Sequence, residues 1–106
     1  MKIKILIPIF NDWDSVSELI KNINLEIKNL NHEVSVIVIN DASTEKYKLD
    51  IKSIENINLV ELINMRENRG HTRCIALGLK YIFEKKDFDY VIPMDGDGED
   101  KPSEIK

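Results

Sequence analysis

The chain has 106 residues, of which 42% are hydrophobic and 32% charged, and its formal net charge at pH 7 is -4. This is the length of one domain and the composition of an ordinary globular protein. Its basic residues are dispersed, which argues against a nucleic-acid partner, and no apolar run approaches the roughly 20 residues of a membrane span. The single cysteine, Cys74, cannot form an internal disulfide, which suits a reducing compartment. We therefore expect a cytoplasmic domain.

The hydrophobic pattern alternates between strand and helix from the start of the chain. Residues 3–9 (IKILIPI) are a nearly continuous apolar run, which predicts a strand buried on both faces. Apolar residues then recur at helical spacing over residues 16–30, and Ser15 and Glu18 have the capping-box spacing that predicts the start of this helix. Residues 34–39 (VSVIVI) are rich in β-branched side chains and predict a second strand.

The second half of the chain continues this alternation. Residues 45–55, rich in lysine and glutamate, predict a short surface helix, and residues 59–63 (LVELI) predict a third strand. Residues 70–85 predict a second long helix, and residues 88–94 (FDYVIPM) a fourth strand. This order predicts an α/β fold with a mostly parallel sheet of about four strands and helices on both faces.

Mostly polar residues follow each predicted strand. In parallel sheets, ligands bind beyond the carboxyl ends of the strands, near a switch in strand order. The sequence therefore predicts a binding site at an acidic edge of the sheet. The segments there are Phe10-Asn11-Asp12, Asn40-Asp41-Ala42-Ser43, residues 64–70 and Asp95-Gly96-Asp97.

Asp95 and Asp97 are candidate metal ligands. Two carboxylates one residue apart, each followed by glycine, can converge on one divalent cation, and oxygen ligands favour magnesium, manganese or calcium over zinc. A calcium-binding EF-hand loop is excluded, because its sixth and twelfth positions, counted from Asp95, hold Asp100 and Lys106. A solvated acidic loop is the alternative interpretation, since a short D-x-D pattern is weak by itself.

Two further positions at this edge have both a functional and a structural interpretation. Asp41 either accepts a hydrogen bond from a base or ribose, or belongs to an ordinary turn. The amides at the start of the helix at Gly70, with Arg73 in its first turn, favour an anion such as a diphosphate. Alternatively, Asn68 only caps this helix and Gly70 only makes a turn.

Four other residues are interpreted as structural or as surface residues. Cys74 and Gly78 are small, and we expect them to let the second long helix approach the sheet. His71 and His32 are interpreted as surface histidines, because neither has a visible partner in the sequence.

Four segments in order resemble the family 2 glycosyltransferases, the GT-A fold enzymes that use nucleotide-diphosphate sugars. The segments are ILIPIFND, VIVINDAST, ENRGHTRCIALGLKY and VIPMDGDGEDKPSEI. The last is most similar to the dolichyl- and polyprenyl-phosphate sugar transferases, where D-x-D is followed by an acid and a proline, here Asp100 and Pro102. The resemblance implies that residues 1–106 are the Rossmann-like nucleotide-sugar-binding half of a GT-A domain, truncated before its acceptor-binding half.

The resemblance also implies roles for individual residues. Phe10 would stack on the base, Asp41 would contact the base or ribose, and Asp97 would be the principal metal ligand. Three positions depart from the family pattern: Asn40 replaces a common acid, Ala42 a usual glycine and Cys74 a usual alanine. The implied nucleotide-sugar-binding residues are Pro8, Phe10, Asn11, Asp12, Asp41, Asn68, Gly70, Arg73, Asp95 and Gly96, and the implied metal ligands are Asp95 and Asp97.

The activity that the resemblance implies is metal-dependent sugar transfer. The donor would be a UDP- or GDP-linked sugar, the acceptor a polyprenyl phosphate, a saccharide or a protein, and the cofactor Mg²⁺ or Mn²⁺. Family members usually invert the anomeric centre and use a carboxylate base. That base would lie beyond Lys106, so we expect this chain alone to bind donor without catalysing transfer. The full-length protein is expected at the inner face of the membrane.

Three alternatives remain at the level of sequence. A nucleotidyltransferase would carry a glycine-rich basic loop after the first strand, and IPIFNDWDS offers none. A non-catalytic module that binds nucleotide or metal, such as a phospho-acceptor receiver domain, would need an acceptor aspartate after a middle strand and a late lysine. An inert fragment with an unpaired strand edge would self-associate.

Overall fold

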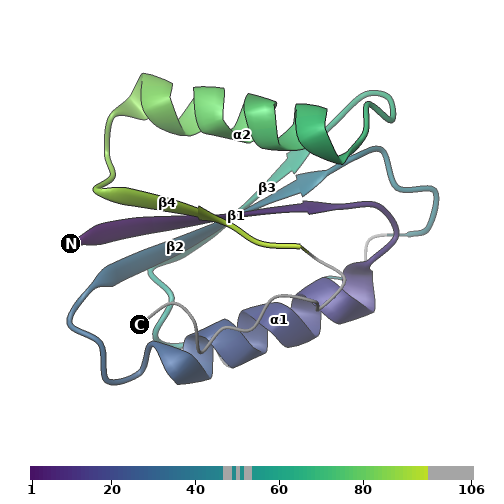
Figure 1. Cartoon of the computed structure of the whole chain (residues 1–106). Helices are drawn as coiled ribbons and strands as arrows, with labels where there is room; N and C mark the ends of the chain where they lie inside the picture. Colours follow the sequence, from purple (N-terminus) through teal and green to yellow (C-terminus); the bar gives the residue numbers. More distant parts are fainter. Residues whose placement is uncertain (47–48, 50, 52–53, 96–106) are drawn as a thin grey trace.

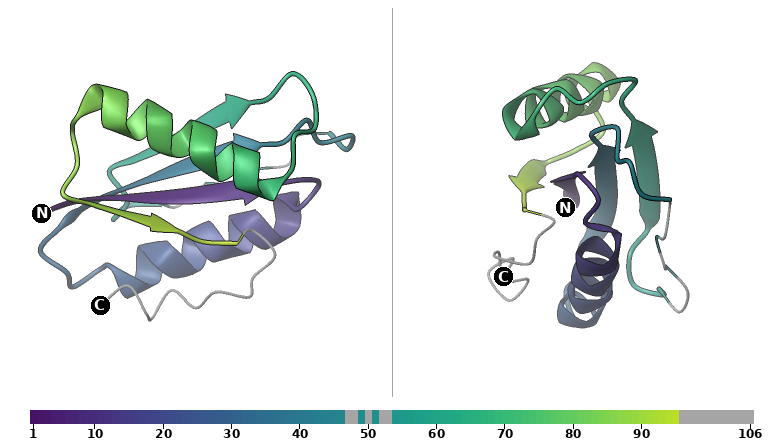
Figure 2. Two further views of the ribbon diagram at one scale, coloured as in Figure 1. Left: turned by 45° about the horizontal axis from the view of Figure 1, so that its top comes forward. Right: turned by 90° about the vertical axis from the view of Figure 1, so that its right-hand side faces the viewer.

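The computed structural model describes residues 1–46, 49, 51 and 54–95. Four parallel strands form one sheet in the order β3-β2-β1-β4, which confirms the predicted fold class. Helix α1 covers one face of the sheet and α2 the other (Figures 1 and 2). The elements are β1 (Lys2–Ile9), α1 (Trp13–Glu26), β2 (Glu33–Asn40), β3 (Leu59–Asn64), α2 (His71–Lys85) and β4 (Tyr90–Pro93).

The two central strands are buried on both faces, as their continuous apolar sequences predict. Alternate residues of β1, among them Ile5 and Ile7, pack in the larger core cluster with α1, whereas Leu6 points to the opposite cluster with α2. This alternation follows from the two-residue period of a strand. The edge strands β3 and β4 are only partly buried.

Helix α1 begins three residues earlier than the Ser15–Glu18 spacing predicts. Its first residue is Trp13, its N-cap is Asp12, and no side chain caps it, so the predicted capping box is wrong. Trp13, the first residue of the helix, is buried in the larger core cluster. The helix ends at Glu26, before Leu30.

The predicted helix over residues 45–55 is wrong for the described residues of that segment, none of which is helical. The last residue of the segment and the two residues after it bond instead to a buried asparagine on α1. The Asn24 side-chain oxygen accepts hydrogen bonds from the backbone amides of Glu55, Asn56 and Ile57, at 3.2, 2.7 and 3.3 Å. The Glu55 amide therefore cannot also form the hydrogen bond that a helix over residues 45–55 would need from it.

Helix α2 starts at His71 after Gly70, as predicted, and packs very close to the sheet. A Cβ atom added at Gly78 would lie 2.4 Å from a methyl carbon of Leu6 on β1. Gly78 therefore lets the helix approach the sheet, which confirms the structural interpretation of this residue. Strand β4 is shorter than the predicted 88–94 segment, because only four residues pair with β1.

The register brings the carboxyl ends of the central strands to one level. Ile9 of β1 pairs with Asn40 of β2, and Asn40 pairs with Asn64 of β3. Because β2 and β3 lie on one side of β1 and β4 on the other, the order of strands switches at β1. Among the described residues, no helix is long and apolar enough to cross a membrane.

Candidate functional site

A small pocket lies at the carboxyl edge of the sheet, next to the strand switch. Its volume is about 120 Å³. The residues around it come from the end of β1, the loop into α1, the end of β2 and the start of α2. They are Pro8, Ile9, Phe10, Asp12, Asp41 and His71. The sequence predicted the first, third, fourth and fifth of these as site residues.

The β1–α1 loop presents Phe10 and Asp12 to the pocket but turns Asn11 away from it. Asn11 has a positive φ of 60°, a conformation that asparagine tolerates better than most residues. Its side chain donates a hydrogen bond to the Thr44 hydroxyl and accepts one from the Glu45 amide, both at 2.9 Å. Asn11 thus joins the loop between β1 and α1 to the segment that follows β2.

Asn40 has a similar structural role at the end of β2. Its side chain donates a hydrogen bond to the Asn64 side-chain oxygen at 2.9 Å, and accepts one from the Ser43 amide at 3.0 Å. These bonds shape a turn in which Ala42 has φ 57°. Glycine adopts this backbone conformation without steric cost, so alanine here carries some strain.

Asp41 is the most buried charged residue of the pocket, with 4% of its surface exposed. One carboxylate oxygen accepts a hydrogen bond from the Arg69 amide at 2.7 Å, and the other accepts one from the Gly70 amide at 2.9 Å. The Asn68 side chain donates to the Asp41 carbonyl at 3.3 Å. Asp41 is therefore bonded to the whole N-x-G segment before α2.

Cys74 lies one helical turn into α2 and is completely buried. Burial raises the pKa of its thiol to about 11, helped by a hydrogen bond to Asp41 and by the charge of that carboxylate. The thiol therefore stays protonated at neutral pH and acts as a donor to Asp41. This contact adds a chemical role to the small size that the sequence predicted.

His71 and Asp95 meet across the mouth of the site. The Nε2 atom of His71, the first residue of α2, lies 3.0 Å from a carboxylate oxygen of Asp95, just after β4. Both side chains are partly exposed, so the pair itself contributes little stability. His71 is exposed, as the sequence predicts for a surface histidine, but it also has Asp95 as a partner and lines the pocket. Its place directly after the N-x-G segment, at a helix start on this edge, was the signal available in the sequence.

The remaining predicted site residues divide into two groups. Asn68, Gly70 and Arg73 are described, and all lie at the start of α2, where Gly70 is the N-cap residue and Arg73 is exposed. Gly96, Asp97, Asp100 and Pro102 lie outside the described residues. Of the predicted metal pair, only Asp95 can therefore be located. The described part of the chain contains no group of three or more histidine, cysteine, aspartate or glutamate side chains that could hold a metal ion.

Comparisons with known proteins agree on one family. A family model described as "Glycosyl transferase family 2" matches residues 4–106. The chain is 29% identical to the undecaprenyl-phosphate 4-deoxy-4-formamido-L-arabinose transferase of Proteus mirabilis over 106 residues, which are 98% of this chain and 31% of that protein. It thus spans about a third of the length of this curated relative.

Two solved structures have a similar fold. The crystal structure of S. aureus TarS matches with a TM-score of 0.68 and 25% identity, over 92% of this chain and 17% of that one. The structure of S. aureus TarS 1-349 matches with a TM-score of 0.62 and 24% identity, over 92% of this chain and 28% of that one.

Proposed function

Because the chain belongs to glycosyl transferase family 2, we propose that its pocket binds the nucleotide diphosphate of a sugar donor. In this proposal the whole protein transfers the sugar to an acceptor. The observation that carries the proposal is the composition of the pocket. An exposed aromatic ring, buried apolar residues and carboxylates from separate loops converge at the strand switch, where α/β sheets bind nucleotides. Family membership favours this function over a nucleotidyltransferase or a receiver domain.

The apolar part of the pocket suits a nucleotide base. Phe10 is 42% exposed, although a large aromatic side chain normally gains free energy from burial. It lies beside Pro8 and Ile9, which are buried at the end of β1. In the proposal the base stacks on Phe10 and covers it.

The charged part suits a diphosphate only if a cation is also bound. Asp12 and Asp41 line the pocket, and Asp95 lies beside His71 at its mouth. Three carboxylates would repel a diphosphate. We propose that Asp95 and Asp97 hold Mg²⁺ or Mn²⁺, which prefer such oxygen ligands, and that Arg73 and the start of α2 supply further positive potential. A bound cation would neutralise charge on the departing diphosphate.

The transfer step would exchange one carbon–oxygen bond for another. An acceptor oxygen, which is a phosphate oxygen in a polyprenyl phosphate and a hydroxyl oxygen in a saccharide, attacks the anomeric carbon. The bond from that carbon to the diphosphate oxygen breaks, and the nucleoside diphosphate leaves with the electron pair. A hydroxyl acceptor would pass its proton to a base, for which we assign no residue in this chain, whereas an ionised phosphate oxygen carries no proton to remove. The pocket residues would hold the leaving group throughout.

The name of the Proteus relative suggests the class of acceptor. That protein is described as an undecaprenyl-phosphate sugar transferase. We propose a polyprenyl phosphate as the acceptor of the whole protein, with saccharides and proteins as alternatives. Because such an acceptor is a membrane lipid, the whole protein would work at a membrane surface.

Calorimetric titration with UDP and GDP, with and without Mn²⁺, tests the donor site. We expect one of the two nucleotides to bind with an affinity that Mn²⁺ increases at least about tenfold, equivalent to about 1.4 kcal/mol. Asp97→Asn should remove most of this increase. Paramagnetic broadening of the Asp95 amide signal by Mn²⁺ alone gives a second readout of the metal site.

Glu84→Gln is the matched control for the loss of a carboxylate. Glu84 is exposed near the end of α2, about 20 Å along the helix from His71 at 1.5 Å per residue. This variant should bind nucleotide and Mn²⁺ like the wild type. A folded wild-type protein that binds neither nucleotide with or without Mn²⁺ would overturn the proposed function.

A further inference from the structure

Residues 66–86 differ in charge from the rest of the chain. They span the segment before α2, the helix itself and its C-cap residue Lys86. They contain six lysines and arginines and two glutamates, a formal charge of +4, whereas the whole chain has -4. The other residues therefore carry -8. Such an asymmetry turns the α2 side of the molecule toward negative charge.

The outer face of α2 is exposed. Figure 2 shows the helix as the outer layer on its side of the sheet, and its buried residues Cys74, Gly78 and Ile82 recur every four positions. On the opposite face, exposed basic and apolar side chains alternate at helical spacing. These residues, which we call the outer ridge, are Arg73, Leu77, Lys80 and Phe83.

The two apolar members of the outer ridge leave much of their surface in water. Leu77 is 39% exposed and Phe83 is 53% exposed, although the Phe83 ring lies against Phe88 with the ring centroids 5.2 Å apart. Burial of such side chains in an apolar medium is favourable. One exposed apolar residue is ordinary, but two on a basic ridge indicate a partner that is both apolar and negatively charged.

The positive charge of this face is not neutralised within the described part of the chain. No ion pair found there involves Arg73, Lys80 or Lys86. In contrast, Arg69 in the segment before the helix pairs with Glu67 at 3.0 Å. Three cations on and beside the outer ridge are thus available to an external anion.

A bilayer that contains anionic lipids offers both kinds of contact. Its headgroups attract lysine and arginine, and leucine and phenylalanine side chains insert at the boundary between headgroups and acyl chains. A protein partner fits less well, because charged residues are depleted at the centre of protein interfaces. In addition, α2 begins at the pocket, which His71 lines, so a helix lying on lipid would bring the pocket close to a lipid-linked acceptor.

We propose that the outer ridge of α2 docks this chain on an anionic membrane surface. The proposal rests on the proposed function, in which the acceptor is a membrane lipid, and adds the face of the domain that meets the lipid. The charge of -8 on the other residues is repelled by the same surface, which disfavours other orientations.

Co-sedimentation with lipid vesicles tests the docking. The wild type should bind vesicles of phosphatidylcholine and phosphatidylglycerol in equal parts at an ionic strength of about 0.05 M. Binding should fall at least about tenfold on vesicles of phosphatidylcholine alone, or when the ionic strength is raised to about 0.5 M. A folded wild type that does not bind the anionic vesicles would overturn the proposal.

Two double variants test the two kinds of contact. Lys80→Gln with Lys86→Gln should weaken binding to the anionic vesicles at least about tenfold, and Leu77→Ser with Phe83→Ser at least about fivefold. If the apolar double variant binds like the wild type, the surface attracts polyanions in general, such as RNA, and membrane docking is contradicted.

Matched controls lie away from α2. Lys28→Gln with Lys46→Gln removes the same charge from two exposed lysines, and Leu25→Ser removes a side chain of α1 that is 67% exposed. Both controls should bind vesicles within about twofold of the wild type. A loss as large as that of the α2 variants would show that binding does not depend on the outer ridge.

NMR with spin-labelled lipid gives a readout that needs no variant. In bicelles with the same two headgroups, a nitroxide on the lipid headgroup should broaden the amide signals of α2 more than those of α1, and the reverse order would contradict the docking. Nucleotide titration separates the two proposals. Vesicle binding through α2 by a chain that binds neither UDP nor GDP contradicts only the donor site. Nucleotide binding by a chain that does not bind vesicles contradicts only the docking.

Discussion

Cys74 illustrates how burial and a neighbouring charge determine the chemistry of one residue. Its side chain is fully buried between α2 and the sheet, and it faces the carboxylate of Asp41. A thiolate there would be desolvated and would lie beside another negative charge. The neutral thiol is therefore favoured, and Cys74 should be chemically inert in the folded protein.

We predict that a thiol reagent modifies Cys74 only when the protein unfolds. At pH 8 the rate measured with Ellman's reagent should fall at least about a hundredfold on folding, because only a protonated, inaccessible thiol is present. Urea should restore the rate of a free cysteine. Rapid modification of the native protein would contradict the described burial.

The raised pKa of Cys74 also predicts the direction of a pH effect. The folded thiol has a pKa of about 11 against an ordinary value of 9.0, so the folded state holds this proton more tightly than the unfolded state. The stabilising contribution is present below pH 9 and is lost as the pH rises toward 11. Thermal melts of wild type and Cys74→Ala across this range should show a steeper decline in the wild type.

At the scale of elements, the contact between α2 and β1 depends on one missing side chain. Gly78 is buried in the middle of α2, where glycine usually weakens a helix by about 1 kcal/mol relative to alanine. The Leu6 methyl groups occupy the space that a Cβ atom would need. Close packing therefore outweighs helix propensity at this position.

Gly78→Ala should destabilise the protein by up to about 2 kcal/mol. Overpacking against Leu6, which is buried in a packed core and must shift, costs about 1–3 kcal/mol, and the helix propensity of alanine offsets about 1 kcal/mol of it. The free energy of unfolding in urea gives the measurement. The reverse exchange at an exposed position of the same helix, Ala76→Gly, is the control and should cost about 1 kcal/mol from propensity alone. A more stable Gly78→Ala variant would show that the Leu6 contact does not limit packing.

The structure of the segment before β3 could not be predicted from its local sequence pattern. The mixture of charged and apolar residues over 45–55 favours a helix locally, yet the Asn24 side chain binds the amides of residues 55–57. Asn24 is buried on α1 together with Ile20 and Ile23, although it is polar. Its partner, more than thirty residues away, could not be predicted from spacing.

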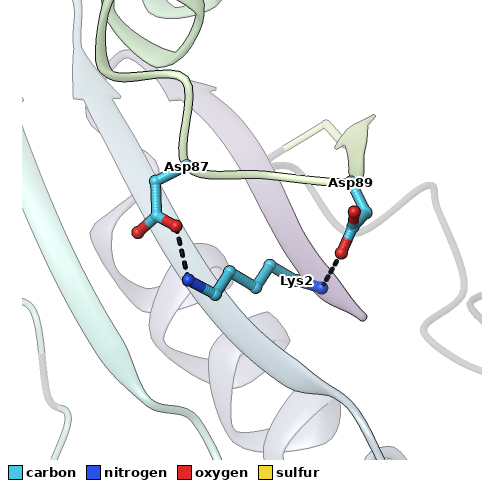
Figure 3. A network of polar contacts seen from close by, with 3 residues as sticks. All are labelled: Lys2, Asp87 and Asp89. Carbon is cyan, nitrogen blue, oxygen red and sulfur yellow. Dashed lines mark hydrogen bonds and ion pairs between the residues drawn. The ribbon is translucent and has the colours of Figure 1, made fainter.

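At the scale of the molecule, polar contacts join the start of β1 to the segment just before β4. The Lys2 side chain forms an ion pair with Asp87 at 2.6 Å, and its backbone amide donates to Asp89 at 2.7 Å (Figure 3). These bonds join the start of β1 to the segment between α2 and β4. They help to align β4 with β1 at the edge of the sheet, where Asp95 follows.

The Lys2–Asp87 pair should make stability depend on pH in two ranges. The hydrogen bond and charge of Lys2 lower the pKa of Asp87 from 3.8. The contribution of Asp87 to the free energy of unfolding is therefore present above pH 3.8, and it is lost as the pH falls through the lower pKa that Asp87 has in the folded state. The Asp87 carboxylate raises the pKa of Lys2 from 10.5. The contribution of Lys2 to the free energy of unfolding is therefore present below pH 10.5 and is lost as the pH rises above that value. Lys2→Met should lower Tm by a few degrees at most at pH 7, since both groups are exposed.

The control for this pair is Lys80→Met, which removes an exposed lysine from α2. Its melting temperature should decline between pH 5 and pH 2 as steeply as that of the wild type, whereas the decline in Lys2→Met should be shallower. Equal slopes in all three proteins would show that the ion pair contributes nothing measurable.

An apolar groove lies at the edge of the sheet beside β4, and its exposed apolar surface favours self-association. A pocket of about 460 Å³ lies there, with Ile3, Tyr90 and Ile92 among its lining residues, and Tyr90 is 56% exposed. Exposed apolar surface beside an edge strand favours association. Self-association of this chain stays a prediction, which sedimentation at several concentrations would test.

The sequence by itself determined the order of the four strands and the two long helices, the parallel sheet and the edge at which the candidate pocket lies. Alternating two-residue and helical periods are local properties, and parallel strands necessarily bring residues 10–12, 40–43 and 95 to one edge. Only the tertiary structure decided which of these side chains meet. The Asp41 bonds to Arg69 and Gly70, and the contact of His71 with Asp95, depend on register and on how closely α2 packs. Such contacts join residues that are far apart in the chain, so the local spacing of apolar and polar residues cannot predict them.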